Sequence, residues 1–224
     1  MTRGFRGLMG AAFLAIAGPL AGQGLSDYDY EDLSFRGIGF DVGYIWPNDV
    51  ESTESFGLRV DLGYLGPGIR VLPRVGYWSS ALDATEVARL ETRVVQLVQE
   101  QNPGAPPLDL DLGRVEWRDL SVGADAQFVW RVPYDILTYA GLGVAVHFRN
   151  GSGEAVDDTF VEDLLDSTAA GANLHGGLEV PLSRRFRLYG DARYELAGDV
   201  RFFGVRAGLQ ILFQDPAPGE RSSS

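Results

Sequence analysis

Cysteine and lysine are both absent from this sequence of 224 residues. Without cysteine the sequence holds no disulfide, no thiolate metal site and no lipid-modified cysteine. All 19 basic side chains are therefore arginine, and 31 acidic ones outnumber them, which leaves a formal net charge of −12. A chain this acidic repels phosphates, so we expect no nucleic acid among its partners.

Long hydrophobic runs are also scarce. One run follows Arg3 and Arg6 and ends in small residues, which is typical of a secretory signal peptide over residues 1–24 and is too short to span a bilayer as a helix. We expect residues 25–32 to form an acidic periplasmic arm. The Pro-, Gly- and Ser-rich segment 214–224 predicts a disordered tail.

What the chain does have is a repeated alternation of apolar with polar or small residues. In the last segment, Phe203, Val205 and Leu209 alternate with Arg206 and Gly208. A period of two predicts a β-strand with one apolar face. Eight such segments are found, at 35–46, 56–64, 69–78, 115–132, 137–148, 172–182, 185–196 and 200–213.

The connections between these segments alternate in length. Those at 65–68, 133–135 and 181–184 are tight, whereas those at 79–114 and 149–171 are long. Tight turns at one end and mostly longer loops at the other are typical of an up-and-down membrane barrel with both termini in the periplasm. A soluble barrel can also have eight strands, so the connection lengths alone do not distinguish a membrane barrel from a soluble one.

The aromatic residues favour the membrane barrel. On the apolar faces they fall near strand ends, where two rings would meet the two lipid interfaces. The ring near the long loops comprises Tyr44, Trp46, Phe56, Tyr77, Phe148, Tyr194 and Phe203. The ring near the turns comprises Tyr64, Phe128, Trp130, Phe186 and Phe213. The opposite faces carry charges that an apolar ligand cavity would not tolerate unpaired.

The closing strand adds a motif of its own. Its residues Arg206, Gly208, Ile211 and Phe213 resemble the C-terminal assembly signal of bacterial outer-membrane barrels. With the architecture, the chain resembles the small eight-stranded barrels of the OmpA transmembrane-domain, OmpX and OmpW type over residues 33–213. The resemblance implies an all-β fold: an eight-stranded antiparallel up-and-down transmembrane β-barrel, with two short helices in long extracellular loops.

The same resemblance implies a setting and partners. The protein would be exported to the outer membrane, contact outer-membrane lipid and lipopolysaccharide, and be recognised by the barrel-assembly machinery, which closes the last strand on the first. We expect a monomer. Nothing in the sequence calls for a cofactor.

The inner face predicts a polar lumen network of Asp41, Arg59, Asp61, Arg74, Asp119, His147, His175, Glu179, Arg187, Asp191 and Arg206. Paired charges would fill the small lumen in place of a hydrophobic core. The alternative is a proton or cation path, or a site where the two histidines meet Asp119 and Asp191. No ligand spacing for a metal is present.

A tight turn at 181–184 sets the expected register of that network. It would place Glu179 opposite Arg187 and His175 opposite Asp191, and the next hairpin would bring Asp191 near Arg206. The first hairpins would place Asp41, Arg59, Asp61 and Arg74 on neighbouring inner positions.

Each of the two longest loops predicts a helix. Residues 83–100 have an apolar stripe, with Asp83 as N-cap and Glu86 three residues on. Residues 157–166 predict a shorter helix. We expect the apolar faces to pack on one another or on the barrel rim; binding of a ligand, lipid or surface protein is the alternative.

One segment invites an enzymatic interpretation. Residues 147–151, HFRNG, faintly resemble the His-x-Ser-Asn segment of outer-membrane lipid A deacylases, but Arg149 stands where the nucleophile belongs. We therefore assign no catalytic and no metal-binding residue. The sequence favours a structural or surface-interaction barrel, with a narrow channel for small or apolar solutes as the alternative and a lipid-modifying enzyme after that.

Overall fold

The computed structural model describes residues 33–66, 68–104, 106, 110–157 and 159–213. The predicted signal peptide, acidic arm and C-terminal tail lie outside them. The strands are β1 (Gly37–Pro47), β2 (Thr53–Asp61), β3 (Tyr64–Gly66), β4 (Ile69–Ala81), β5 (Glu116–Val132), β6 (Ile136–Ser152), β7 (Ser167–Pro181), β8 (Phe186–Ala197) and β9 (Val200–Leu212). The helices are α1 (Ala84–Gln101) and α2 (Phe160–Leu165).

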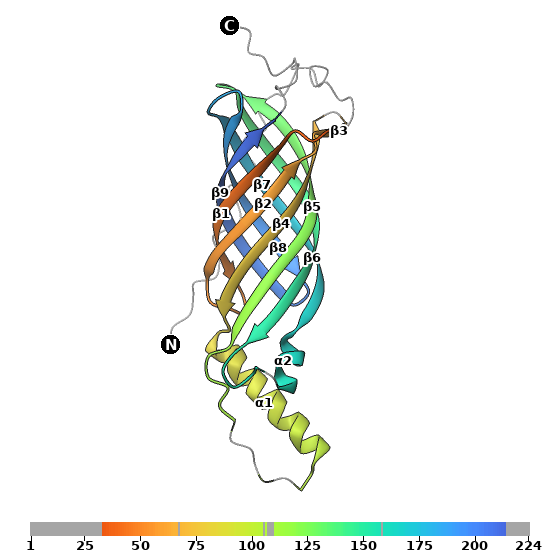
Figure 1. The fold of residues 1–224 in the computed structure, drawn as a ribbon, viewed down its shortest axis with the longest axis vertical. Coiled ribbons are helices and arrows are strands. Elements are labelled where there is room, and N and C mark those ends of the chain that lie inside the picture. Colours follow the sequence, from red (N-terminus) through yellow and green to blue (C-terminus); the bar gives the residue numbers. More distant parts are fainter. Residues whose placement is uncertain (1–32, 67, 105, 107–109, 158, 214–224) are drawn as a thin grey trace, which may run out of the picture.

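The strands form one closed antiparallel barrel (Figure 1). Their order is β2-β1-β9-β8-β7-β6-β5-β4-β3, and β4 also pairs with β2, which closes the sheet. Strands β2 and β3 together take the place of one strand of the barrel, because both pair with β4. The strand is interrupted next to Gly63, whose φ of +76° suits glycine. The eight-stranded up-and-down barrel predicted from the sequence is thus confirmed.

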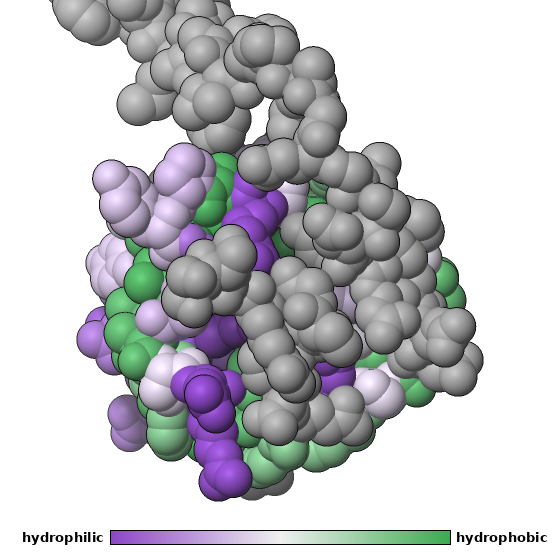
Figure 2. Space-filling model, turned by 90° about the horizontal axis from the view of Figure 1, so that it is seen from above, coloured by the Kyte–Doolittle hydropathy of each residue, from purple (hydrophilic) through white to green (hydrophobic). Residues whose placement is uncertain are grey.

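The alternation in sequence separates the two faces of the wall. Phe40 and Val42 are 57% and 59% exposed on the outside, whereas Asp41 between them is 4% exposed inside the barrel. In Figure 2 the barrel is seen from the end with short turns, and hydrophobic residues are visible around its outline with hydrophilic ones among them. The apolar face therefore points outward, as in a membrane barrel and unlike a soluble one.

Both helices lie at one end of the barrel, which we call the loop end (Figure 1). The short turns lie at the opposite end, which we call the turn end. Asp83 is the N-cap of α1, but its side chain makes no capping hydrogen bond, so the predicted capping interaction is wrong. Neither helix in the described part of the chain is long and apolar enough to cross a membrane.

The two helices share an apolar core that we call the helix platform. Its buried members are Val94, Leu112, Val115, Val156, Val161 and Leu165. Trp117 Nε1 donates to the carbonyl oxygen of Leu165 at 3.2 Å, which fixes α2 to the start of β5. The apolar faces thus pack on one another and on the barrel rim, the first of the two arrangements considered.

Three local predictions are wrong. Strand β6 continues to Ser152, so Asn150 and Gly151 pair with β5 rather than beginning a loop. Strand β7 begins at Ser167, five residues earlier than predicted, since its start pairs with the extension of β6. Tyr64 is only 6% exposed and faces inward, because the irregularity at Gly63 reverses the alternation in β3.

Candidate functional site

The interior of the barrel, its lumen, is the place where charged side chains gather. Among the described residues, seven carboxylates and seven guanidinium groups point into it, with the two histidines. The carboxylates belong to Asp41, Asp61, Asp119, Asp125, Glu179, Asp191 and Glu195. The guanidinium groups belong to Arg59, Arg70, Arg74, Arg149, Arg187, Arg193 and Arg206. All eleven residues of the predicted lumen network are among these side chains, and the two signs balance.

Glu179 is the centre of the turn-side half of the lumen. Its carboxylate is fully buried and lies 2.7 Å from Arg59 Nη2, 2.5 Å from Arg70 Nη2 and 3.6 Å from Arg187 Nη1. Gln210 accepts a hydrogen bond from Arg59 at 2.5 Å. A buried carboxylate is stable only when it is paired and hydrogen-bonded. These four charged residues form what we call the Glu179 cluster.

The predicted register of the β7–β8 hairpin is wrong by two residues. Glu179 pairs with Tyr189 and His175 with Arg193. The turn is wider than expected, because the backbone N–H groups of Leu182 and Ser183 both donate to the carbonyl of Phe186. A shift of two residues keeps every side chain on its face, which is why Arg187 still reaches Glu179 diagonally.

Asp41 lies next to the Glu179 cluster and is held by hydrogen bonds of its own. It accepts a hydrogen bond from Arg74 Nη2 at 2.7 Å and another from the Tyr189 hydroxyl at 2.9 Å. The Arg59 guanidinium stacks over the Tyr189 ring, 3.3 Å from its centroid. Gly208 makes room for this ring, since a Cβ there would lie 2.5 Å from Tyr189 Cζ. Asp41 and Arg74, which we expected on neighbouring inner positions, therefore form a direct ion pair.

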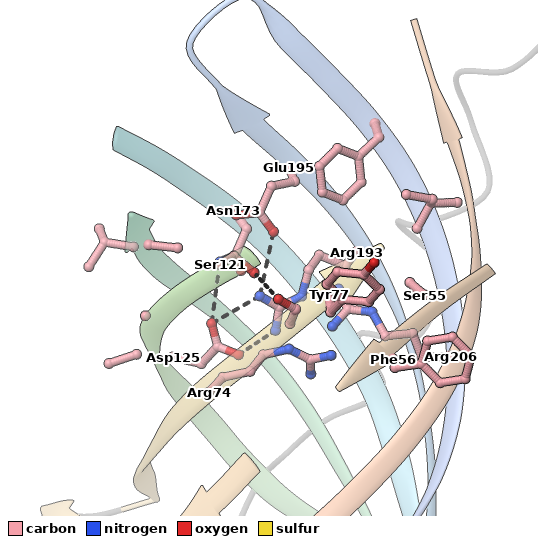
Figure 3. A pocket seen from close by; sticks show the side chains of 17 residues that line it. Ser55, Phe56, Arg74, Tyr77, Ser121, Asp125, Asn173, Arg193, Glu195 and Arg206 are labelled. Atoms are coloured by element: carbon pink, nitrogen blue, oxygen red, sulfur yellow. Dashed lines mark hydrogen bonds and ion pairs between the residues drawn. The ribbon is translucent and has the colours of Figure 1, made fainter. Parts of the chain in front are cut away.

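The middle of the lumen is built around Asp125. Both of its oxygens accept hydrogen bonds from Arg193, and Asn173 Nδ2 donates to Oδ1 at 3.3 Å (Figure 3). His175 lies 2.8 Å from Asn173 Oδ1 and 3.2 Å from Gln127 Nε2. His175 is thereby part of an amide-rich layer.

Nearer the loop end, Asp119 takes the central place. It lies 3.0 Å from His147 Nδ1 and 3.0 Å from Arg149 Nε, and Glu195 lies 3.5 Å from His147 Nε2. The alternative arrangement, in which both histidines meet Asp119 and Asp191, does not occur, because His175 belongs to the Asp125 layer. Among the described residues, no group of three or more His, Asp or Glu side chains is arranged to hold a metal ion.

The HFRNG segment forms no triad in the described structure. Arg149 points into the lumen and donates to Asp119 and to the carbonyl of Ala197 at 2.7 Å. Ser121 is paired with His147 across the sheet, but its hydroxyl lies 3.4 Å from the carbonyl of Gly76. Arg149 was not predicted as a lumen residue, because the expected strand ended at Phe148.

A cluster that sequence reasoning missed closes the loop end of the lumen. It consists of Ile45, Val50, Trp78, Val200 and Phe202, all nearly fully buried, and we call it the apolar plug. The rings of Trp78 and Phe202 meet edge to face with centroids 6.3 Å apart. The available signal was large apolar residues at inward parity, since Ile45, Trp78 and Phe202 stand beside outward aromatic neighbours.

The predicted assembly signal lies along the seam between β9 and β1, which pair from Gly37↔Leu212 to Pro47↔Phe202. Arg206 and Gly208 face the lumen, and Phe213 is exposed on the outside, where its ring stacks on Phe35 at 5.4 Å. The last strand therefore closes on the first.

Comparison with known proteins gives a likeness of fold. No protein-family model matches the chain, and no curated protein matches it. Among solved structures, Neisserial surface protein A matches with a TM-score of 0.51 and 16% identity, covering 82% of this chain and 100% of that one.

Two other structures are similar at lower scores. The attachment invasion locus protein Ail of Yersinia pestis has a TM-score of 0.46 and 13% identity, covering 81% of this chain and 100% of its own. A major outer membrane protein of Thermus thermophilus has a TM-score of 0.44 and 13% identity, covering 80% and 99%. The closed barrel, its outward apolar face and the neisserial likeness together show that this chain has the fold of the small eight-stranded outer-membrane barrels.

Proposed function

We propose that this protein is a closed barrel of the outer membrane whose role is structural or surface interaction. Its wall supports this location: the outward face is apolar, and aromatic pairs such as Trp46–Phe203 and Phe128–Trp130 lie toward opposite ends. Aromatic residues at both ends of an apolar band are what two lipid interfaces select.

The observation that carries the proposal is how the lumen is filled. Arg70, Glu179 and Gln210 are 0% exposed within the barrel, and the apolar plug lies beyond them toward the loop end. Water and ions need a continuous polar path, and eight strands enclose a space that side chains can fill. A filled lumen favours a scaffold over a narrow channel.

The helix platform supports the interaction role. It projects beyond the barrel at the loop end (Figure 1), and its apolar residues are used in its own packing. With both termini in the periplasm, this end faces the cell exterior. Outer-membrane lipid and lipopolysaccharide would surround the wall, and the barrel-assembly machinery would insert it. A partner would then meet the polar outer surface of α1.

Location is tested by expression in a Gram-negative host. The protein should fractionate with the outer membrane, lack its first 21 to 24 residues, a span taken from the small-residue end of the signal segment, and migrate differently on gels before and after boiling. Recovery as a soluble periplasmic protein of full β content would refute the proposal.

Conductance separates the scaffold from the channel. Purified protein in a planar bilayer should give no steady, porin-sized current, and deletion of residues 84–100 should not create one, since the block lies in the lumen. Stable openings of the intact protein would establish the channel instead. Openings only after the deletion would make α1 a gate.

A further inference from the structure

A cavity of about 40 Å³ lies in the lumen next to the apolar plug, and Figure 3 draws the side chains that line it. Its lining includes Ile45 and Phe202 of the plug and the charged residues Asp125 and Arg74. A water molecule needs roughly 10–15 Å³ on this measure, so the space accommodates a small hydrated group or one monatomic ion. The cavity has both polar and apolar lining residues and is unused by the proposed function.

Arginines outnumber carboxylates among the residues that line this cavity. Three guanidinium groups line it, from Arg74, Arg193 and Arg206, against two carboxylates, from Asp125 and Glu195. Figure 3 draws the three arginine side chains converging on the same space. Arg74 is held by Asp41 at 2.7 Å and Arg193 by both oxygens of Asp125. Arg206 is the least satisfied of the three.

Arg206 is buried, with only 6% of its side chain exposed, and its ion pair is with Asp191 Oδ1 at 4.0 Å, beyond hydrogen-bond distance. Gly43 makes room for this side chain, because a Cβ there would lie 2.5 Å from Arg206 Cγ. A guanidinium has five N–H donors, and leaving them unmet in a buried site is costly.

Further donors point the same way. The hydroxyl of Ser55 and Nε of Arg193 belong to residues that line the cavity, and within the described residues neither has a hydrogen-bond partner; the acceptor Oε1 of Glu195 has none either. An anion can accept a hydrogen bond from each of the donors. Its negative charge also reduces the repulsion between the guanidinium groups more than a water molecule would in a confined space.

We propose that this cavity binds one small monovalent anion of the chloride class, held by Arg206 with Ser55 and Arg193. The anion offsets the positive charge of the Arg206 guanidinium, whose carboxylate partner Asp191 lies 4.0 Å away. It is enclosed between the plug and the Glu179 cluster, so it enters when the barrel folds and exchanges slowly afterward. The site goes beyond the scaffold role and does not depend on it.

The test is refolding of the protein into detergent micelles in chloride or in gluconate, which is too large for the cavity, at equal ionic strength. Micelles avoid any need for the assembly machinery. Because a ligand that binds only the folded state stabilises it, the melting temperature should be several degrees higher in chloride. Arg206→Gln should abolish the difference, whereas the matched control Arg201→Gln, an exposed arginine of the same strand, should keep it.

Crystals of the wild-type protein grown in bromide give a second measurement that needs no variant. An anomalous peak among Arg74, Arg193 and Arg206 is expected. Equal melting in the two salts, or a cavity without an anomalous peak, overturns the proposal. A chloride effect that Arg206→Gln retains overturns it too, because the ion then binds elsewhere.

Discussion

The turn-side half of the lumen holds the Glu179 cluster, whereas the loop end is closed by the apolar plug. Both fill the same barrel, but they resist different changes. In the cluster, one carboxylate is shared by three arginines, so its stability depends on keeping the pairs together. In the plug, Trp78 and Phe202 fill volume, so stability depends on close packing. One barrel therefore combines an interior sensitive to charge with one sensitive to size.

The largest effect is expected from Glu179→Gln. The change removes the Glu179 carboxylate from the buried Arg59 and Arg70, and breaking a buried pair costs about 3–5 kcal/mol. Urea unfolding of protein refolded into micelles measures the loss. The matched control is Glu54→Gln, on the exposed part of β2, where we expect a change within about 0.5 kcal/mol. Equal stability of the two variants would contradict the structure of the cluster.

The plug is tested by Phe202→Ala. Removing a buried phenylalanine ring costs about 3 kcal/mol or more, because it loses apolar burial and leaves a cavity. Phe203→Ala is the control, since the neighbouring ring points outward and is 45% exposed. Unfolding measured in the same way should show the larger loss for Phe202. If Phe203→Ala costs as much, the loop end is stabilised from the lipid side and not by the plug.

The difference between the two regions also explains what the sequence could predict. The wall and the inward charges follow from a period of two, which every strand but β3 keeps over most of its length. Partner choice did not follow: Glu179 was assigned to Arg187 alone, yet it also binds Arg59 and Arg70, which lie 120 and 109 residues away. Such contacts depend on how the barrel closes, which local pattern does not encode.

The plug was not predicted for a related reason. Val50 lies in a connection and Val200 at a strand end, Ile45 is a single large apolar residue among the small or polar inward residues of β1, and Phe202 is followed inward by Gly204, Arg206 and Gly208. Tyr64 was assigned outward since nothing in the alternation signals the break at Gly63, where φ is +76°. The wide turn at Ser183 likewise depends on hydrogen bonds that form only in the folded hairpin.

A smaller effect is expected at the helix platform, which extends the comparison beyond the lumen. Val94 is 3% exposed in its core, and Val→Ala removes about 1.5 kcal/mol of burial at roughly 0.8 kcal/mol per carbon. The chain has no lysine, so trypsin cuts α1 only after arginine, at Arg89 and Arg93. Cleavage there should accelerate about tenfold if it follows local opening.

The matched control for Val94→Ala is Gln96→Ala, an exposed residue of α1, which should leave the cleavage rate unchanged. Unfolding of the barrel itself should be the same in both variants, because the apolar plug separates the platform from the lumen. A barrel weakened by Val94→Ala would mean that platform and plug unfold as one unit.

The smallest effect on stability is expected from Phe213→Ala, at the turn end of the outer wall. Its ring stacks on Phe35 with centroids 5.4 Å apart, and such a pair is worth about 0.5–1.5 kcal/mol. A double-mutant cycle with Phe35→Ala isolates that term from the loss of lipid contact. A coupling near zero would show that the lumen alone stabilises this end.

Phe213→Ala should have a larger effect on assembly than on stability. If the residue is the terminal aromatic of an assembly signal, insertion in cells slows and unassembled protein accumulates, whereas refolding into micelles proceeds at nearly the wild-type rate. Phe160→Ala is the control, because Phe160 is 52% exposed on α2 and lies outside the barrel wall. Equal insertion of wild type and Phe213→Ala would refute the signal while leaving the stacked pair intact. Slow folding in both settings would instead make Phe213 a residue of the barrel seam, needed wherever β9 closes on β1.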